Sequence, residues 1–171
     1  EDPGTIRLTA VRRTEARSTL STEADDREDR REPDVSVDLD WQGDLRFRAR
    51  AGEFVTEMDG DTERATSPVQ MLLHSVGGCA AVDMIHILRK GREDVRGLAV
   101  RVSGHRAEDH PRRLTRLSVD FRLTGDVDPS AAERAARLSF ETYCSCYQSL
   151  REDIELDYRV SIDRPGGEGN L

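Results

Sequence analysis

Residues 67–91 read SPVQMLLHSVGGCAAVDMIHILRKG and carry helix signals at both ends. Ser67 is a suitable N-cap, and Pro68 suits the first helical position because no N–H is needed there. Gly91 is a C-terminal stop signal. Between these signals, residues 71–88 are apolar nearly all round. The segment therefore predicts one long helix that is buried in a core or in a subunit interface.

Shorter segments with alternating apolar and polar residues lie on both sides of this helix. Alternation with a period of two residues is typical of half-buried strands bounded by turns. The predicted strands are 35–40, 45–50, 53–58, 98–107, 114–124 and 154–162. Two further helices are predicted, one over residues 129–142 and a short one ending at about residue 152. The order βββ-α-ββ-αα-β predicts an α+β fold with antiparallel sheet against the long helix.

The composition limits the kinds of partner that the chain is expected to bind. Charged residues make up 35% and aromatic residues only 5%, so the core is expected to be aliphatic. The formal net charge of -8 argues against nucleic acid or an anionic membrane as the main partner. No apolar run approaches the roughly 20 residues of a membrane span. Residues 1–11 also lack the apolar region of a signal peptide, so we expect a cytoplasmic protein.

Three segments are predicted along the chain. Residues 1–33 combine mixed charges with few apolar side chains, which predicts a disordered tail that cannot offset the entropy cost of ordering. Residues 34–164 are expected to form the folded domain. Residues 165–171 are expected to be a frayed C-terminus.

Cys79 stands in the middle of the long predicted helix, between small neighbours. It is either an inert buried residue or a reactive thiol. A position in mid-helix is far from the N-terminal dipole that lowers a thiol pKa, and Asp83 one turn later would raise it. A reactive Cys79 would therefore need a cation from elsewhere, for which the strand arginines Arg46, Arg48 and Arg50 are candidates.

The segment Cys144-Ser145-Cys146 falls at a break between two predicted helices. Free backbone N–H groups at a helix start favour thiolate, although the segment can equally be a polar junction with incidental cysteines. A zinc site is a further alternative. It would join Cys79 and the two junction cysteines to His74, His86, His105 or His110. Because Cys-x-Cys is tighter than the usual ligand spacing and the histidines are scattered, we expect no metal and no cofactor.

Several motifs resemble those of one known family. The strings SPVQMLL (67–73) and VGGCAAVDMI (76–85) are similar to the signature of the OsmC/Ohr family, the osmotically inducible and organic-hydroperoxide-resistance proteins. The strings ILRKGREDV (87–95), HPRRLT (110–115) and YCS (143–145) resemble its YhfA-like subgroup. Trp41 and the segment Met58-Asp59-Gly60 fit the opening strands. The resemblance covers roughly residues 35–161.

The resemblance implies a fold, an assembly and an activity. It implies an intertwined homodimer in which antiparallel sheets surround a long buried central helix from each subunit. By motif position, Cys79 matches the peroxidatic cysteine and Cys144 the resolving cysteine of thiol-dependent peroxidases. The implied reaction reduces a small organic hydroperoxide through a Cys79 sulfenic acid, which Cys144 resolves as a disulfide. An external dithiol would then restore both thiols, in defence against oxidative stress.

One position departs from the pattern of the active family members. Val69 stands where they have a Glu that pairs with a thiolate-stabilising Arg, and no arginine here matches that Arg by motif. The alternative function is therefore a non-catalytic dimer of the same fold that binds an apolar or thiol-reactive small ligand. Cys146 is an additional thiol, either a substitute resolving cysteine or a residue without a redox partner.

Overall fold

The computed structural model describes residues 5–9 and 34–164, which fall into two compact units. The first unit contains strand β1 (Thr5–Thr9) and the described chain from Leu72 onward. The second contains the described residues up to Met71. Helix α2 (Pro68–Lys90) crosses this boundary in its first turn.

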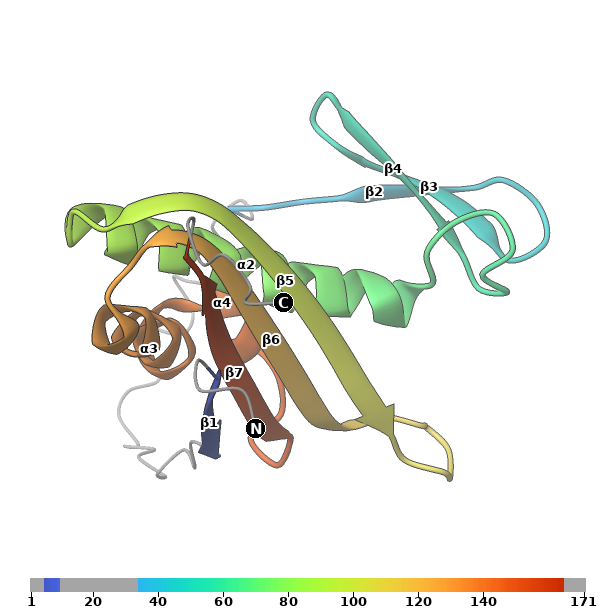
Figure 1. Cartoon of the computed structure of the whole chain (residues 1–171). Coiled ribbons are helices and arrows are strands. Elements are labelled where there is room, and N and C mark those ends of the chain that lie inside the picture. The colour runs from blue at the N-terminus through green and yellow to red at the C-terminus, as the bar shows by residue number, and fades with distance from the viewer. Residues whose placement is uncertain (1–4, 10–33, 165–171) are drawn as a thin grey trace, which may run out of the picture. The chain divides into compact units, whose positions relative to one another are not determined.

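A four-stranded sheet forms the framework of the first unit, in the order β1-β7-β6-β5 (Figure 1). Its long strands are β5 (Asp94–Arg106), β6 (Leu114–Asp126) and β7 (Glu155–Asp163). β5 and β6 are antiparallel, as predicted, but β6 and β7 run parallel. The prediction of a purely antiparallel sheet is wrong at this pair, because the chain returns through a helical crossover instead of a hairpin.

The crossover between β6 and β7 contains three helical segments. These are α3 (Pro129–Leu138), the π-helix η1 (Ser139–Tyr143) and α4 (Ser145–Gln148). Asp128 caps α3, since its carboxylate accepts a hydrogen bond of 3.0 Å from the N–H of Ala131. The first predicted helix is confirmed and ends in a π-helical turn. The short second helix is present but spans Ser145–Gln148, so its predicted end at about residue 152 is wrong.

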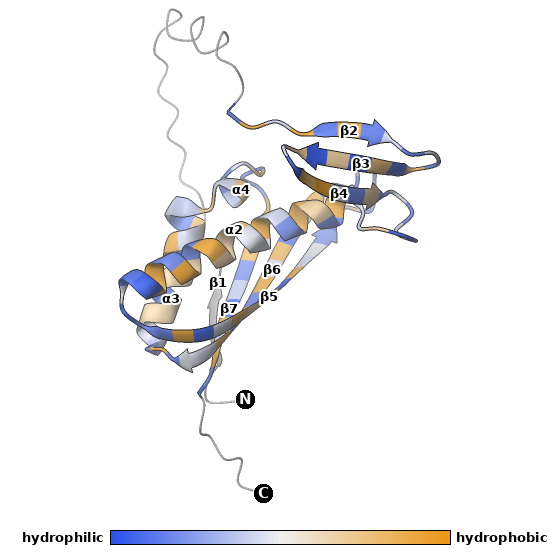
Figure 2. Cartoon of the chain, turned by 90° about the horizontal axis from the view of Figure 1, so that it is seen from above, coloured by the Kyte–Doolittle hydropathy of each residue, from blue (hydrophilic) through white to orange (hydrophobic). Residues whose placement is uncertain are grey.

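The core of the first unit lies between the sheet and its helices. Alternate residues of β6 are fully buried, among them Val119 and Phe121. Phe140 of η1 packs in the centre, with its ring 6.1 Å from that of Phe121 and 5.2 Å from that of Tyr158. The residues between them on β6 are polar and form ion pairs such as Arg159–Asp120. This alternation places the helices on one face of the sheet, and Figure 2 shows α2 lying across the strands on that side.

Helix α2 begins and ends where its sequence predicts. The N–H of Ser67 donates to Oε1 of Gln70 at 2.9 Å, and the N–H of Gln70 donates to Oγ of Ser67 at 3.3 Å. This reciprocal pair is a capping box, and the helix ends at Lys90. Contrary to the sequence-based expectation, α2 is long and apolar enough, by length and composition alone, to cross a membrane, and 28% of its apolar stretch is buried within the chain. Its buried residues are Val76, Gly77, Ala80, Met84 and Leu88.

The second unit is an antiparallel sheet of three strands, as predicted. Its strands are β2 (Asp38–Trp41), β3 (Arg46–Ala51) and β4 (Phe54–Asp59), in that order. One face of the sheet is apolar and the other is charged. The apolar face carries Leu39, Trp41, Phe47, Ala49, Phe54 and Met58, most of which are exposed within the chain.

The predicted disordered tail over residues 1–33 needs one correction. Residues Thr5–Thr9 form β1, which pairs antiparallel with β7. The strand was missed because it is short and is separated from its partner by most of the chain. The other residues of the predicted tail, and residues 165–171, lie outside the described residues.

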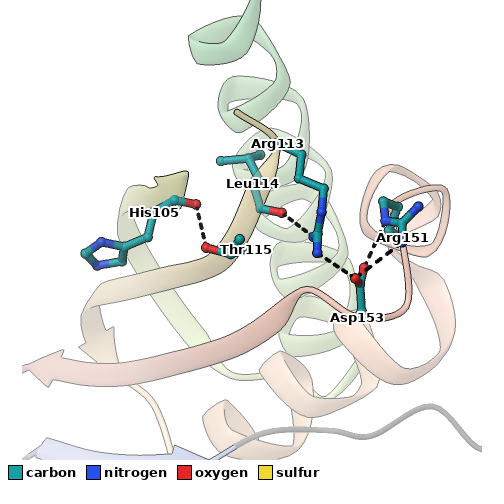
Figure 3. A network of polar contacts seen from close by, with 6 residues as sticks. All are labelled: His105, Arg113, Leu114, Thr115, Arg151 and Asp153. Carbon is teal, nitrogen blue, oxygen red and sulfur yellow. Dashed lines mark hydrogen bonds and ion pairs between the residues drawn. The ribbon is translucent and has the colours of Figure 1, made fainter. Parts of the chain in front are cut away.

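Exposed ion pairs join the loop before β7 to the start of β6. Asp153 accepts from Arg151 at 3.0 Å and pairs with Arg113 at 2.9 Å (Figure 3). The hydrogen bond from Arg151 keeps the pKa of Asp153 below its ordinary value. The network joins the start of β6 to the loop that leads into the parallel strand β7.

Candidate functional site

Cys79 lies in the middle of α2, and its thiol is half-buried. Its Sγ is 3.8 Å from Oγ of Ser145, the first residue of α4. The residues on either side of Ser145 are also close to Cys79: the Cys144 sulfur lies within 4.8 Å of the Cys79 sulfur, and Cys146 and Cys79 shift each other's pKa. The folded chain therefore brings all three cysteines together, although their positions in the sequence are far apart.

Cys144 is held by the π-helical turn that precedes it. Its N–H donates a hydrogen bond of 2.8 Å to the carbonyl oxygen of Ser139, five residues earlier. Its side chain is completely buried, and the thiol donates to the carbonyl oxygen of Val76 at 3.8 Å. Because π-helical turns are rare and frequently mark functional sites, the turn is consistent with a role for Cys144 beyond packing.

A carboxylate completes the cluster. The sulfurs of Cys79 and Cys144 and a carboxylate oxygen of Asp83 all lie within 4.8 Å of one another. Asp83 accepts a hydrogen bond of 2.9 Å from Oγ of Ser139, a buried residue of η1. The sequence analysis considered Asp83 only as a repulsive charge and missed Ser139. The signal for Asp83 was available, since residues four apart on a helix share a face.

The surroundings of Cys79 favour its thiolate. Burial alone would raise the pKa of the Cys79 thiol. Hydrogen bonding to the thiolate has the larger effect. It comes first from the backbone N–H of Cys146 and then from the side chains of Cys144, Ser145 and Cys146, so the pKa of Cys79 lies below its ordinary value. Backbone N–H groups at the start of α4 therefore act on Cys79, whereas the sequence analysis expected them to act on the junction cysteines.

The other two thiols are held in the protonated form. Burial, followed by the neighbouring Cys79, raises the pKa of Cys144 to about 12, although a hydrogen bond from the backbone of Tyr147 acts the other way. Burial and then the charge of Cys79 also raise the pKa of Cys146. The site thus contains one thiol biased toward the anion beside two that remain neutral and can donate hydrogen bonds.

The arginines proposed as thiolate partners belong to the other unit. Arg48 pairs with Glu57 at 3.2 Å, and Arg50 pairs with Asp40. Their role at Cys79 stays a prediction. His86, one of the four histidines considered as zinc ligands, is exposed on α2. The group that the fold assembles with two of the thiols is instead the Asp83 carboxylate.

A cavity of about 480 Å³ lies between α2 and β5. Its lining is mainly apolar and comes from two segments of the first unit. The lining residues are Leu73, His74, Gly77, Gly78, Ala81, Val100, Arg101 and Val102. The lining includes Gly78 and Ala81 of α2 but none of the residues of the thiol cluster.

The chemistry open to this arrangement follows from its three sulfurs. A thiolate with neighbouring thiols at this distance can be oxidised and then form a disulfide after a small movement. A cluster of thiols with a carboxylate can also coordinate a metal ion. The two uses exclude each other at any one moment.

Comparisons with known proteins agree with the fold and with the motifs. The family model described as OsmC-like protein matches residues 59–159. Protein YhfA of Escherichia coli (strain K12) is 37% identical over 107 residues, which span 61% of this chain and 80% of YhfA.

Solved structures share the architecture of the chain. A hypothetical protein from Aquifex aeolicus VF5 has a TM-score of 0.73 at 26% identity, and the match covers 78% of this chain and 99% of that one. An organic hydroperoxide resistance protein from Elizabethkingia anophelis has a TM-score of 0.61 at 11% identity, covering 78% and 99%, which is a likeness of fold alone. Because the family model spans more than half of the chain and includes both Cys79 and Cys144, this protein belongs to the OsmC family.

Proposed function

We propose that this chain is a thiol-dependent peroxidase that reduces organic hydroperoxides in defence against oxidative stress. The observation that carries the proposal is the pairing of Cys79, whose surroundings favour the thiolate, with Cys144 less than 4.8 Å away. Some structural relatives are named organic hydroperoxide resistance proteins. A cytoplasmic location belongs to the same proposal, because the reaction needs thiols that are kept reduced.

The first step is oxidation of Cys79. Its thiolate attacks the outer oxygen of the hydroperoxide, the O–O bond breaks, and the alkoxide leaves and takes up a proton to become an alcohol. Cys79 is thereby oxidised by two electrons to a sulfenic acid. The hydrogen bonds from the Cys146 backbone and the Ser145 hydroxyl support this step, because they stabilise the attacking anion.

The second step forms the disulfide. The sulfur of Cys144 attacks the sulfenic sulfur, the S–O bond breaks, and the departing hydroxide leaves as water with the Cys144 proton. An external dithiol then reduces the disulfide by thiol–disulfide exchange. Because Cys144 is fully buried, it is shielded from direct oxidation and meets the oxidant only through Cys79.

We infer a preference for organic substrates over hydrogen peroxide from the apolar cavity that borders the same helix α2. Its lining of leucine, valine, alanine and glycine suits an alkyl or aryl group, and Arg101 and His74 add polar groups. The same cavity favours the second candidate, a protein that binds an apolar or thiol-reactive ligand without turnover. The two candidates differ in whether peroxide is consumed.

We also propose that the chain acts as a homodimer. Within the chain, Val82 of α2 is 57% exposed, and Trp41 and Phe54 on the sheet of the second unit are 67% and 81% exposed. Such apolar surface is unusual for a monomer and is typical of an interface. A second copy would cover these side chains in each unit.

The test measures consumption of cumene hydroperoxide by the reduced full chain, with an external dithiol as reductant and a chelator present. Cys79→Ser is expected to abolish turnover. Cys144→Ser is expected to allow one oxidation per chain and then to stop, with the sulfenic acid trapped by a selective reagent. Equal rates for wild type and Cys79→Ser would refute the peroxidase and leave the ligand-binding protein as the better account.

A further inference from the structure

The site contains more metal-ligating groups than a two-thiol peroxidase uses. That reaction assigns the thiols of Cys79 and Cys144 and leaves the Asp83 carboxylate and the Cys146 thiol without a role. A carboxylate oxygen of Asp83 lies within 4.8 Å of both reactive sulfurs. Cys146 is close enough to Cys79 for the charge of Cys79 to raise the pKa of its thiol, after burial. The Asp83 carboxylate thus converges on the same point as the two assigned sulfurs, and Cys146 stands beside Cys79.

Helix α2 and the π-helical turn η1 fix the positions of Cys79 and Asp83. Cys79 and Asp83 are four residues apart on α2, so both side chains leave the same face of the helix. Ser139 donates to one oxygen of Asp83 at 2.9 Å and is itself completely buried. Such a donor orients a carboxylate ligand and leaves its other lone pairs free for an ion.

The donor set selects the kind of ion. Thiolate sulfur is a soft ligand that suits zinc and other thiophilic metals, whereas Mg²⁺ and Ca²⁺ prefer oxygen. Zinc takes four ligands in a tetrahedron, with sulfur at about 2.3 Å and carboxylate oxygen at about 2.0–2.2 Å. Three donor atoms within 4.8 Å of one another can close around such an ion with small side-chain movements.

We propose that the reduced chain binds one thiophilic divalent cation, represented by Zn²⁺, through Cys79, Asp83 and Cys144, with Cys146 in the fourth position. This ligand set differs from the zinc alternative in the sequence analysis, because Asp83 replaces the histidine. The binding itself stands on the geometry of the cluster and does not depend on the peroxidase proposal.

The effect of bound Zn²⁺ on the redox chemistry, unlike the binding itself, rests on the proposed peroxidase function. Two thiolates bound to Zn²⁺ and one hydroperoxide, with two protons, give the Cys79–Cys144 disulfide, free Zn²⁺, an alcohol and water. The sulfurs lose two electrons and the O–O bond gains them. Since a disulfide no longer supplies thiolate ligands, oxidation releases the ion, and a bound ion slows oxidation of Cys79.

The test titrates the reduced, chelator-treated full chain with Zn²⁺ alone, in competition with a chromophoric zinc chelator. We expect about one Zn²⁺ per chain. Asp83→Asn and Cys146→Ser are each expected to weaken binding by roughly tenfold or more. Asp120→Asn is the matched control, because it removes an exposed carboxylate that pairs with Arg159 on the sheet.

A second readout on the wild-type chain protects the test against variants that fail to fold. One equivalent of Zn²⁺ is expected to slow iodoacetamide labelling of Cys79 at least tenfold, read by peptide mass spectrometry. Unchanged labelling, or equal affinity of Asp83→Asn and Asp120→Asn for Zn²⁺, would overturn the proposal. No peroxide is present in this experiment, so a chain that does not bind Zn²⁺ leaves the peroxidase proposal unaffected. A chain that binds Zn²⁺ but consumes no peroxide refutes the peroxidase proposal and leaves the zinc proposal unaffected.

Discussion

A Cβ atom built on Gly77 would lie 2.6 Å from Cγ2 of Val102. Helix α2 can therefore approach β5 this closely only with glycine at position 77. The close approach at Gly77 is to a side chain, whereas Gly78 has no atom within 4 Å of its built Cβ among the described residues.

Gly77→Ala is expected to lower the free energy of unfolding by about 1–3 kcal/mol, because overpacking outweighs the helix propensity that alanine adds. The measurement is urea denaturation of the variant and of wild type. Val102→Ala in the same chain makes room for the new methyl group, so the double variant should be less destabilised than the sum of the two single changes. Strict additivity would show that the contact between the two residues does not limit the packing.

A second prediction concerns Asp59, which is 3% exposed at the end of β4. Its carboxylate accepts from the N–H groups of Asp61 at 3.0 Å and Arg64 at 3.1 Å. These bonds, that from Asp61 first, keep its pKa below the ordinary value, although burial acts the other way. A carboxyl with a lowered folded-state pKa stabilises the fold above the unfolded pKa of about 4, and this stability is lost as pH falls through the folded pKa.

Wild type should therefore lose stability as the pH falls below about 4, and Asp59→Asn should show a smaller dependence on pH over that range. The measurement is the urea midpoint as a function of pH. Asp61→Asn is the control, since it removes an exposed carboxylate in the same turn. If both variants follow the wild-type profile, the turn at Asp59 does not stabilise the fold through its charge.

A third prediction tests the homodimer. Val82→Arg places a charge on the exposed face of α2 and should convert the dimer to a monomer, because an unpaired charge is costly at an apolar interface. Molar mass from light scattering after size exclusion measures the change. Ser103→Arg adds the same charge at an exposed position of β5 and should leave the mass unaltered. A wild-type chain that is monomeric at every accessible concentration would contradict the proposal.

Much of the fold follows from local patterns in the sequence. The bounds of α2 come from its N-cap, first-turn proline and stop signal, and the strands β2 to β6 come from alternation of polar and apolar residues. The parallel placing of β7 beside β6 and the pairing of β1 with β7 could not be predicted in this way, because strand partners distant along the chain leave no local signal.

The candidate site shows the same division. Motif resemblance identified Cys79 and Cys144 as partners, and the structure brings both into one cluster. The hydrogen bond from the Cys146 backbone to Cys79 could not be predicted, since it depends on which loop packs against the middle of α2. For that reason the sequence suggested that Cys79 needs a cation, whereas the structure supplies hydrogen bonds.

The most direct test of the central claim is peptide mass spectrometry of the non-reduced chain, before and after one equivalent of cumene hydroperoxide with a chelator present. The account predicts rapid and nearly complete formation of a peptide pair joined between Cys79 and Cys144. The peroxidase proposal would be contradicted if both thiols were still free after this treatment while the fold was intact.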